Sequence, residues 1–148
     1  MCIRDSLQQM GQSVTRLGPA GSGQRCKLSN QIAVAIGMVA WCEALAVAKA
    51  SNLDPSAVQD VIRGGAAGSW GLTNLAPRAL NEDFKPGFLV RHLVKDIRLA
   101  QEEADLHGLC LPGLEVARKL YELVEKLGYG EAGTQVLFHH YETNRGVG

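Results

Sequence analysis

The sequence predicts an all-α fold with one short strand near its beginning. Apolar side chains recur at three- and four-residue intervals through most of the chain, which is the period of a helix buried on one face. Clusters of Gly, Pro and Asn interrupt this pattern and separate the helices. Only residues 10–17 are compatible with a strand. The 148 residues, 46% of them hydrophobic, suffice for one domain with a substantial core.

The longest predicted helix, residues 24–51, contains the apolar run IAVAIGMVAWCEALAVA. A membrane span needs about 20 apolar residues, whereas this run is shorter and includes Glu43. Because it is rich in Ala, which lets neighbouring helices approach closely, we interpret it as a buried helix. The segment SNLDPS predicts that this helix ends at Asn52. A second helix, residues 55–63, follows, with Asp54 as its N-cap and a proline in its first position.

Four more helices follow from the same criteria. The turn GGAAGSWG precedes the first of them, and a Pro-Gly pair in NEDFKPGF, typical of a type II turn, precedes the second. A proline begins the third and glycines end it. The expected ranges are 71–80, 90–107, 112 to the glycine at 128, and 132–141.

Charge and cysteine spacing argue against a nucleic-acid or metal partner. The 15 basic and 15 acidic residues balance, and the basic ones form no stripe. The four cysteines are far apart and form no CxxC pair. His139 and His140 are adjacent, which makes joint metal ligation from a helix awkward. We therefore expect a reduced, cytoplasmic protein that binds no metal, no nucleic acid and no membrane.

The stretch GPAGSGQRCKLSNQ, residues 18–31, is the most unusual part of the sequence. Its glycines have the spacing of a phosphate loop, but Gln24 stands where that loop needs a lysine. Their order, GxxGxG, is not the GxGxxG of a dinucleotide fingerprint, and helices rather than a βαβ unit follow. Neither phosphate-binding interpretation is favoured.

A third interpretation starts from three polar residues near the beginning of the long helix. Lys27, Asn30 and Gln31 lie at i, i+3 and i+4, so they share one helix face. A helix N-terminus and an apolar environment both disfavour the charged form of a lysine, which suits a general acid or base. The two carboxamides can bind a small polar substrate. The alternative is that Lys27 is a solvated residue of the first turns.

Several motifs together resemble the β-hydroxyacid dehydrogenase family, which includes 3-hydroxyisobutyrate dehydrogenase and tartronate semialdehyde reductase and, more distantly, 6-phosphogluconate dehydrogenase. They are GPAGSGQRCKLSNQ, GSWGLTNLAPR, DFKPGF and KDIRLAQEEA, in the family's order, and the match runs from residue 10 to 141. The resemblance implies the helical C-terminal domain of the 6-phosphogluconate dehydrogenase-like type, which follows a Rossmann domain that binds NAD or NADP.

The resemblance also implies a division of the chain. Residues 1–9, which begin MCIRDS, are expected to be a non-native or disordered start. Residues 10–23 are expected to be the last strand and glycine turn of a Rossmann domain that this chain otherwise lacks. Residues 24–142 would form the helical domain for substrate binding and dimerisation, and residues 143–148 a tail.

By resemblance, Lys27 is the catalytic residue, which protonates the carbonyl oxygen in reduction and accepts the hydroxyl proton in reverse. Asn30 and Gln31 match the substrate-binding pair, where many relatives carry two asparagines, so Gln31 is a departure that leaves the substrate open. Gly21 and Gly23 would let the backbone approach the substrate closely.

The resemblance places three further residues beside the cofactor. Lys95 matches a second lysine near the nicotinamide, although its position alone indicates a surface lysine. Asp96 either holds Lys95 or is an exposed helix residue. Phe88 lines the mouth of the pocket or packs in the core. Trp70 is interpreted first as a packing residue and second as cofactor-facing, and Trp41 as a core or interface residue.

The sequence therefore predicts the helical domain of an NAD(P)-dependent oxidoreductase that interconverts a small β-hydroxy acid and its semialdehyde or keto form. We expect a homodimer or higher homo-oligomer, and we expect the isolated chain to be inactive. The alternative is a non-catalytic helical dimerisation or interaction module, which would have no use for Lys27, Asn30 and Lys95 as a set. The hydroxy acid and the choice between NAD and NADP stay open.

Overall fold

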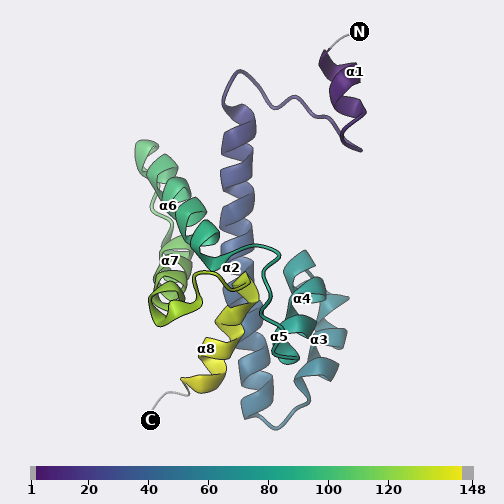
Figure 1. Cartoon of the computed structure of the whole chain (residues 1–148), viewed down its shortest axis with the longest axis vertical. Helices are drawn as coiled ribbons and strands as arrows, with labels where there is room; N and C mark the ends of the chain where they lie inside the picture. The colour runs from purple at the N-terminus through teal and green to yellow at the C-terminus, as the bar shows by residue number, and fades with distance from the viewer. Residues whose placement is uncertain (1–2, 145–148) are drawn as a thin grey trace.

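The computed structural model describes residues 3–144, and helices account for most of them, as predicted (Figure 1). The long helix α2 runs through the middle of the domain, with α6 and α7 on one side of it and α3, α4 and α5 on the other. The elements are α1 (Ile3–Gln8), α2 (Ser22–Ala50), α3 (Pro55–Arg63), α4 (Trp70–Asn74), α5 (Ala76–Leu80), α6 (Val90–Leu106), α7 (Pro112–Val124), the π-helical turn η1 (Glu125–Tyr129), the 3₁₀ turn η2 (Thr134–Val136) and α8 (Leu137–Thr143).

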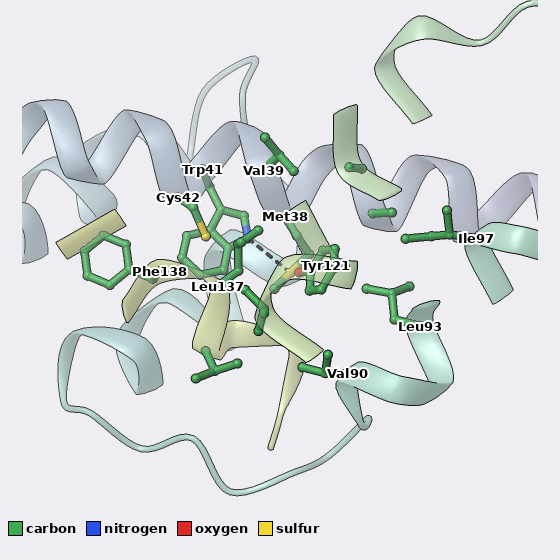
Figure 2. Close-up of a cluster of buried hydrophobic side chains, with 14 of the residues drawn as sticks. Met38, Val39, Trp41, Cys42, Val90, Leu93, Ile97, Tyr121, Leu137 and Phe138 are labelled. Carbon is green, nitrogen blue, oxygen red and sulfur yellow. Dashed lines mark hydrogen bonds between the residues drawn. The ribbon is translucent and has the colours of Figure 1, made fainter. Parts of the chain in front are cut away.

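The hydrophobic core forms where α2 meets α6, α7 and α8. Figure 2 shows the side chains of Met38, Trp41 and Cys42 from α2 directed toward Tyr121 of α7 and Phe138 of α8. The rings of Trp41 and Phe138 lie with centroids 6.3 Å apart. The Trp41 indole N–H is directed at the Met38 sulfur, 3.3 Å away. These contacts confirm Trp41 as a core residue.

The helix α2 is also long and apolar enough to cross a membrane by length and composition. Core helices of soluble proteins pass the same test, so this observation is weak. In the structure one face of α2 is buried against the surrounding helices. This agrees with the interpretation as a buried helix.

The predicted end of α2 and the predicted N-cap of α3 are both found in the structure. Asn52 follows the end of α2 in the left-handed conformation, with φ of 59°, and Leu53 N–H donates to the Ala48 carbonyl. Asp54 caps α3 by accepting a hydrogen bond of 3.0 Å from the Ser56 N–H.

The strand predicted at residues 10–17 is not formed, and this part of the expectation is wrong for the structure. Those residues follow an irregular path, because no described segment offers a neighbouring strand that could pair with them. Residues 3–8, in the segment expected to be a non-native or disordered start, form the short helix α1. Residues 1–2 of the start predicted at residues 1–9, and residues 145–148 of the tail predicted at residues 143–148, lie outside the described residues.

Two predicted helices also differ in detail. The helix expected at residues 71–80 is divided into α4 and α5 at Leu75. Pro77 explains the break, since it has no N–H to donate to the carbonyl four residues earlier. The helix that begins at Pro112 continues beyond α7 as η1, where Gly128 adopts a φ of 96° that favours glycine.

The connection between α5 and α6 is held against η2, and this contact positions part of the site. Leu89 and Gly133 form an isolated antiparallel bridge. Thr134 N–H donates to the Phe88 carbonyl at 3.1 Å. The buried Gln135 side chain donates to the Asp83 carbonyl at 2.9 Å. Phe88 and Thr134 therefore occupy fixed positions beside α2.

Candidate functional site

The first turns of α2 place the predicted catalytic lysine at the edge of the domain. Gly21 is the N-cap residue and has a φ of 91°, a left-handed conformation that glycine adopts without strain. Gly23 follows in the first turn, and its added Cβ would meet nothing within 4 Å. Lys27 lies one turn further on, and 48% of its side chain is exposed. The burial that we expected around Lys27 is therefore only partial in this chain.

A buried carboxylate on α6 brings the polar residues together. Asp96 is 2% exposed and accepts a hydrogen bond of 2.9 Å from Gln31 Nε2 to its Oδ2. Lys27 Nζ lies 3.6 Å from the same Oδ2, and Lys95 Nζ lies 3.0 Å from Oδ1. We refer to Lys27, Gln31, Lys95 and Asp96 as the lysine–aspartate cluster. Two ammonium groups face one carboxylate, so the cluster has an excess of positive charge.

The pKa of Asp96 is held below its usual range by the balance of these contacts. Burial alone disfavours the ionised form and raises the pKa. The contact with Lys95, the hydrogen bond from Gln31 and the charges of Lys95 and Lys27 act in the opposite direction and together outweigh it. Asp96 is therefore ionised at neutral pH. The interpretation of Asp96 as an exposed helix residue is wrong.

The two carboxamides after Lys27 differ in their surroundings. Gln31 is only 8% exposed, and Asn30 is exposed. Asn30 Nδ2 donates to Gln31 Oε1 at 3.2 Å, so a chain of hydrogen bonds runs from Asn30 through Gln31 to Asp96. The longer side chain of glutamine thus connects the start of α2 to α6.

A cavity of about 560 Å³ lies beside the cluster, open to solvent, along one face of α2. Lys27, Asn30 and Gln31 border it at one end, and the remaining wall is mostly apolar. The residues that line it are Lys27, Asn30, Gln31, Ala33, Val34, Gly37, Met38, Trp41, Ser69, Trp70, Gly71, Leu75, Phe88 and Thr134. We refer to this space as the α2 cavity.

The structure brings some of the predicted site residues into the cavity and leaves others outside. Phe88 lines it, as one of its two interpretations proposed. Lys95 and Asp96 lie behind Lys27 and do not line it, and neither do Gly21 and Gly23.

Sequence reasoning missed part of the wall. Trp70 is 71% exposed and lines the cavity, so its first interpretation, as a packing residue, is wrong. Ser69, Gly71, Leu75 and Thr134 also contribute and were not singled out. The motif GSWGL contains Ser69, Trp70 and Gly71, and it is the signal that could have indicated these three residues.

Neither a metal site nor a dinucleotide-binding loop is found among the described residues. Within residues 3–144, no group of three or more His, Cys, Asp or Glu side chains is placed to hold a metal ion. The stretch GYGEAG, residues 128–133, has the spacing GxGxxG. It lies between α7 and α8 instead of between a strand and a helix, so it does not form a dinucleotide-binding loop.

Solved structures of hydroxyacid dehydrogenases have the same helical architecture. A 3-hydroxyisobutyrate dehydrogenase from Salmonella typhimurium superposes with a TM-score of 0.87 at 23% identity, over 93% of this chain and 49% of that chain. A 3-hydroxyisobutyrate dehydrogenase from Mycobacterium tuberculosis, solved with L-serine, gives 0.81 at 26% identity, over 97% of this chain and 50% of that one. The fold is therefore that of a dehydrogenase helical domain.

The sequence comparisons then identify the family. Residues 21–141 match the family described as NAD-binding of NADP-dependent 3-hydroxyisobutyrate dehydrogenase. This chain belongs to that family of oxidoreductases, and the predicted resemblance is confirmed.

Individual relatives match over less than half of their own length. The uncharacterized oxidoreductase YkwC of Bacillus subtilis is 49% identical over 129 residues, which cover 87% of this chain and 45% of the relative. The 2-hydroxy-3-oxopropionate reductase of Escherichia coli is 34% identical over 119 residues, 80% of this chain and 41% of the relative. The chain thus spans about half the length of the curated relatives it matches.

Proposed function

We propose that this chain is the helical, substrate-binding part of an NAD(P)-dependent dehydrogenase that interconverts a small β-hydroxy acid and its semialdehyde or keto form. The observation that carries the proposal is the lysine–aspartate cluster, which holds the Lys27 amine 3.6 Å from a buried carboxylate at the edge of an open cavity. Family membership supports the same reaction class. A non-catalytic module would not require this arrangement.

The residues present fit a nicotinamide cofactor on one side of the cluster. Asp96 Oδ1 is buried and accepts no hydrogen bond of good geometry within the described residues, although Lys95 faces it. Lys95 and Phe88 are the residues that would contact the nicotinamide end, and the buried Asp96 would hold Lys95 in place for this contact. Whether the cofactor is NAD or NADP would be decided by a Rossmann domain. When bound, the cofactor supplies or accepts the hydride.

In this proposal Lys27 handles the proton. In the reducing direction its ammonium group donates a proton to the carbonyl oxygen, and in the oxidising direction its amine accepts the hydroxyl proton. Asp96 positions the Lys27 amine through the contact of 3.6 Å. Asn30 would bind the hydroxyl or carboxylate of the substrate, and Gln31 would hold Asp96 while it borders the cavity.

The proposal includes a homodimer or higher homo-oligomer in the cytoplasm. Exposed apolar side chains on one face of α2, Ile36 and Val47, support an association through this helix. Residues 10–23 would connect the helical domain to a Rossmann domain, and Gly21 and Gly23 would contact the substrate from that connection.

The decisive experiment joins this chain to the part of the Bacillus subtilis relative that the match does not cover, where we expect a Rossmann domain, and compares Lys27→Ala with Lys49→Ala. Both lysines lie on α2 and both are about half exposed, but Lys49 pairs with Glu142 at the opposite end of the helix. We expect Lys27→Ala to lower kcat by roughly 10²–10⁴-fold, the usual contribution of a general acid–base group. Equal turnover by the two variants would contradict the proposal.

A further inference from the structure

We propose that Gln135 is a positioning residue for the cofactor side of the site, because it holds the connection between α5 and α6 that carries Phe88. The inference rests on the proposed function, in which Phe88 contacts the nicotinamide end of the cofactor. It goes beyond that function by giving a role to a buried carboxamide outside the lysine–aspartate cluster and outside the wall of the α2 cavity.

The side chain of Gln135 is a polar group that the fold buries almost completely, with 1% exposed. A buried carboxamide destabilises a chain unless its polar atoms are bonded. Gln135 Nε2 donates to the carbonyl oxygens of Asp83 at 2.9 Å and Lys85 at 3.1 Å, both in the connection between α5 and α6. An amide nitrogen has two hydrogens, so both are used. The donor capacity of Gln135 is therefore directed wholly at this connection.

The residue two positions before Gln135 has to be a glycine for this arrangement. A Cβ added at Gly133 would lie 2.4 Å from Gln135 Oε1 and 2.7 Å from its Nε2. A side chain at Gly133 would therefore displace the carboxamide from its hydrogen bonds. The Gly133 N–H itself donates to the Phe84 carbonyl at 2.8 Å. Three successive carbonyls of the connection, those of residues 83–85, are thus held by Gly133 and Gln135.

The same part of the chain fixes the backbone of Phe88. Thr134 N–H donates to the Phe88 carbonyl at 3.1 Å, and the hydroxyl of the buried Tyr121 donates to the Thr134 carbonyl at 3.1 Å. Phe88 and Thr134 both line the α2 cavity. A substitution that releases the connection from Gln135 would therefore displace the ring of Phe88 without touching the lysine–aspartate cluster.

Hydrogen exchange of the 148-residue chain, followed by NMR, tests the contact itself. Gln135→Met keeps a long, unbranched side chain and removes the carboxamide. We expect the amides of Gly133 and Thr134, which donate to the connection, to lose protection by about tenfold or more relative to the Cys42 amide in the core. A loss of global stability would instead lower the protection of all three amides together. Equal losses would overturn the inference.

Gln59→Met is the matched control. Gln59 is also buried, and its amide donates a hydrogen bond of 2.9 Å to a backbone carbonyl, that of Leu72. This variant loses the same chemical group at a site that does not contact the connection between α5 and α6. It should leave the Gly133 and Thr134 amides as protected, relative to Cys42, as they are in the unchanged chain.

The consequence for the cofactor is measured on the joined chain used to test Lys27, by titration with NADH and NADPH followed by nicotinamide fluorescence. We expect Gln135→Met and Phe88→Leu each to raise the dissociation constant by about two- to tenfold, the usual contribution of one aromatic contact. The double variant should bind no more weakly than either single variant, because Gln135 acts through Phe88. Gln59→Met should bind as the unchanged chain does.

Unchanged cofactor binding in Gln135→Met, equal weakening in Gln59→Met, or additive effects in the double variant would each overturn the inference. A joined chain that binds neither nucleotide would contradict the proposed function and this inference together. The dissociation constant needs no turnover, so the two proposals can also fail separately. If Lys27→Ala retains full turnover while Gln135→Met binds the cofactor weakly, the role of Lys27 is contradicted and the role of Gln135 is supported.

Discussion

The side chain of Gln31 donates a hydrogen bond of 2.9 Å to the carboxylate of Asp96, and both residues are buried. This contact joins the start of α2 to the middle of α6 and places a negative charge 3.6 Å from Lys27 Nζ. The geometry of the candidate catalytic lysine therefore depends on a residue from another helix.

Replacing Gln31 with Leu should lower the free energy of unfolding by about 1.5–3 kcal/mol, because it removes a hydrogen bond to a charged, buried acceptor. Asn30→Leu is the matched control, since Asn30 is exposed and should change stability by less than about 0.5 kcal/mol. Urea unfolding followed by circular dichroism measures both. Equal stability of the two variants would show that the Gln31–Asp96 contact contributes nothing.

The contribution of Asp96 should depend on pH. The pKa of its carboxyl is lowered in the folded chain relative to about 3.9 in an unfolded one, so ionisation stabilises the folded state at higher pH. That contribution is fully present above about pH 4 and is lost as the pH falls through the folded-state pKa.

An Asp96→Asn variant tests this dependence. We expect the difference in unfolding free energy between the unchanged chain and the variant to be largest near neutral pH and to shrink steadily under acidic conditions. Urea titrations at several pH values measure it. A difference that stays constant with pH would show that the carboxylate charge is unimportant for stability.

A second carboxyl offers a direct titration. Contact with the Arg118 guanidinium lowers the pKa of Glu115, in the first turn of α7, to about 2 from an ordinary value of 4.5. In an Arg118→Ala variant, NMR of the Glu115 side chain should show the titration midpoint moving back toward 4.5. Arg98→Ala, which removes a contact to Glu122 only, should leave the midpoint where it is.

Two glycine substitutions should have opposite effects on stability. Gly37→Ala places a Cβ in open space within a long helix and should stabilise the chain by about 0.4–1 kcal/mol. Gly128→Ala forces a side chain into a φ of 96° and should destabilise it by about 1–2 kcal/mol. Thermal unfolding followed by circular dichroism distinguishes the two, and a shift of both midpoints in one direction would refute the assignment.

The purified 148-residue chain should not oxidise NADPH or NADH with small semialdehydes. The glycine turn at residues 18–23 lacks the order of a dinucleotide fingerprint, and the GxGxxG spacing at residues 128–133 lies between two helices. A spectrophotometric assay at 340 nm tests this. Sustained turnover by the chain alone would contradict the division of labour that we propose between a helical and a Rossmann part.

The helices could be predicted from the sequence because their signals are local. Helical periodicity, the Asp54 cap and glycine stops each involve residues close in the chain. The strand at residues 10–17 could not be judged in this way, since a strand depends on a partner elsewhere. The break at Leu75 was missed because the apolar pattern continues across it and only the missing N–H of Pro77 interrupts the helix.

For the candidate site too, groupings within one helix could be predicted from the sequence, whereas contacts between helices could not. Lys27, Asn30 and Gln31 share a helix face by spacing alone, and that grouping is visible in the sequence. The burial of Asp96 and its bond to Gln31 arise from the packing of α2 against α6, which no local pattern reports. Trp70 was assigned to packing because large aromatic residues are usually buried, whereas in this chain it borders an open cavity.

The helix α2 carries two kinds of residue: those buried in the core and those that border the cavity. Ala35, Cys42 and Leu45 are fully buried against the core, whereas Val34 and Gly37 border the cavity and are absent from the buried core. A point substitution at the second kind of position can therefore change the shape of the cavity while the helix packing is preserved. Under the proposed function, a lineage would acquire new substrates by exchanging a few side chains along one helix, and the end that carries Lys27 would stay unchanged.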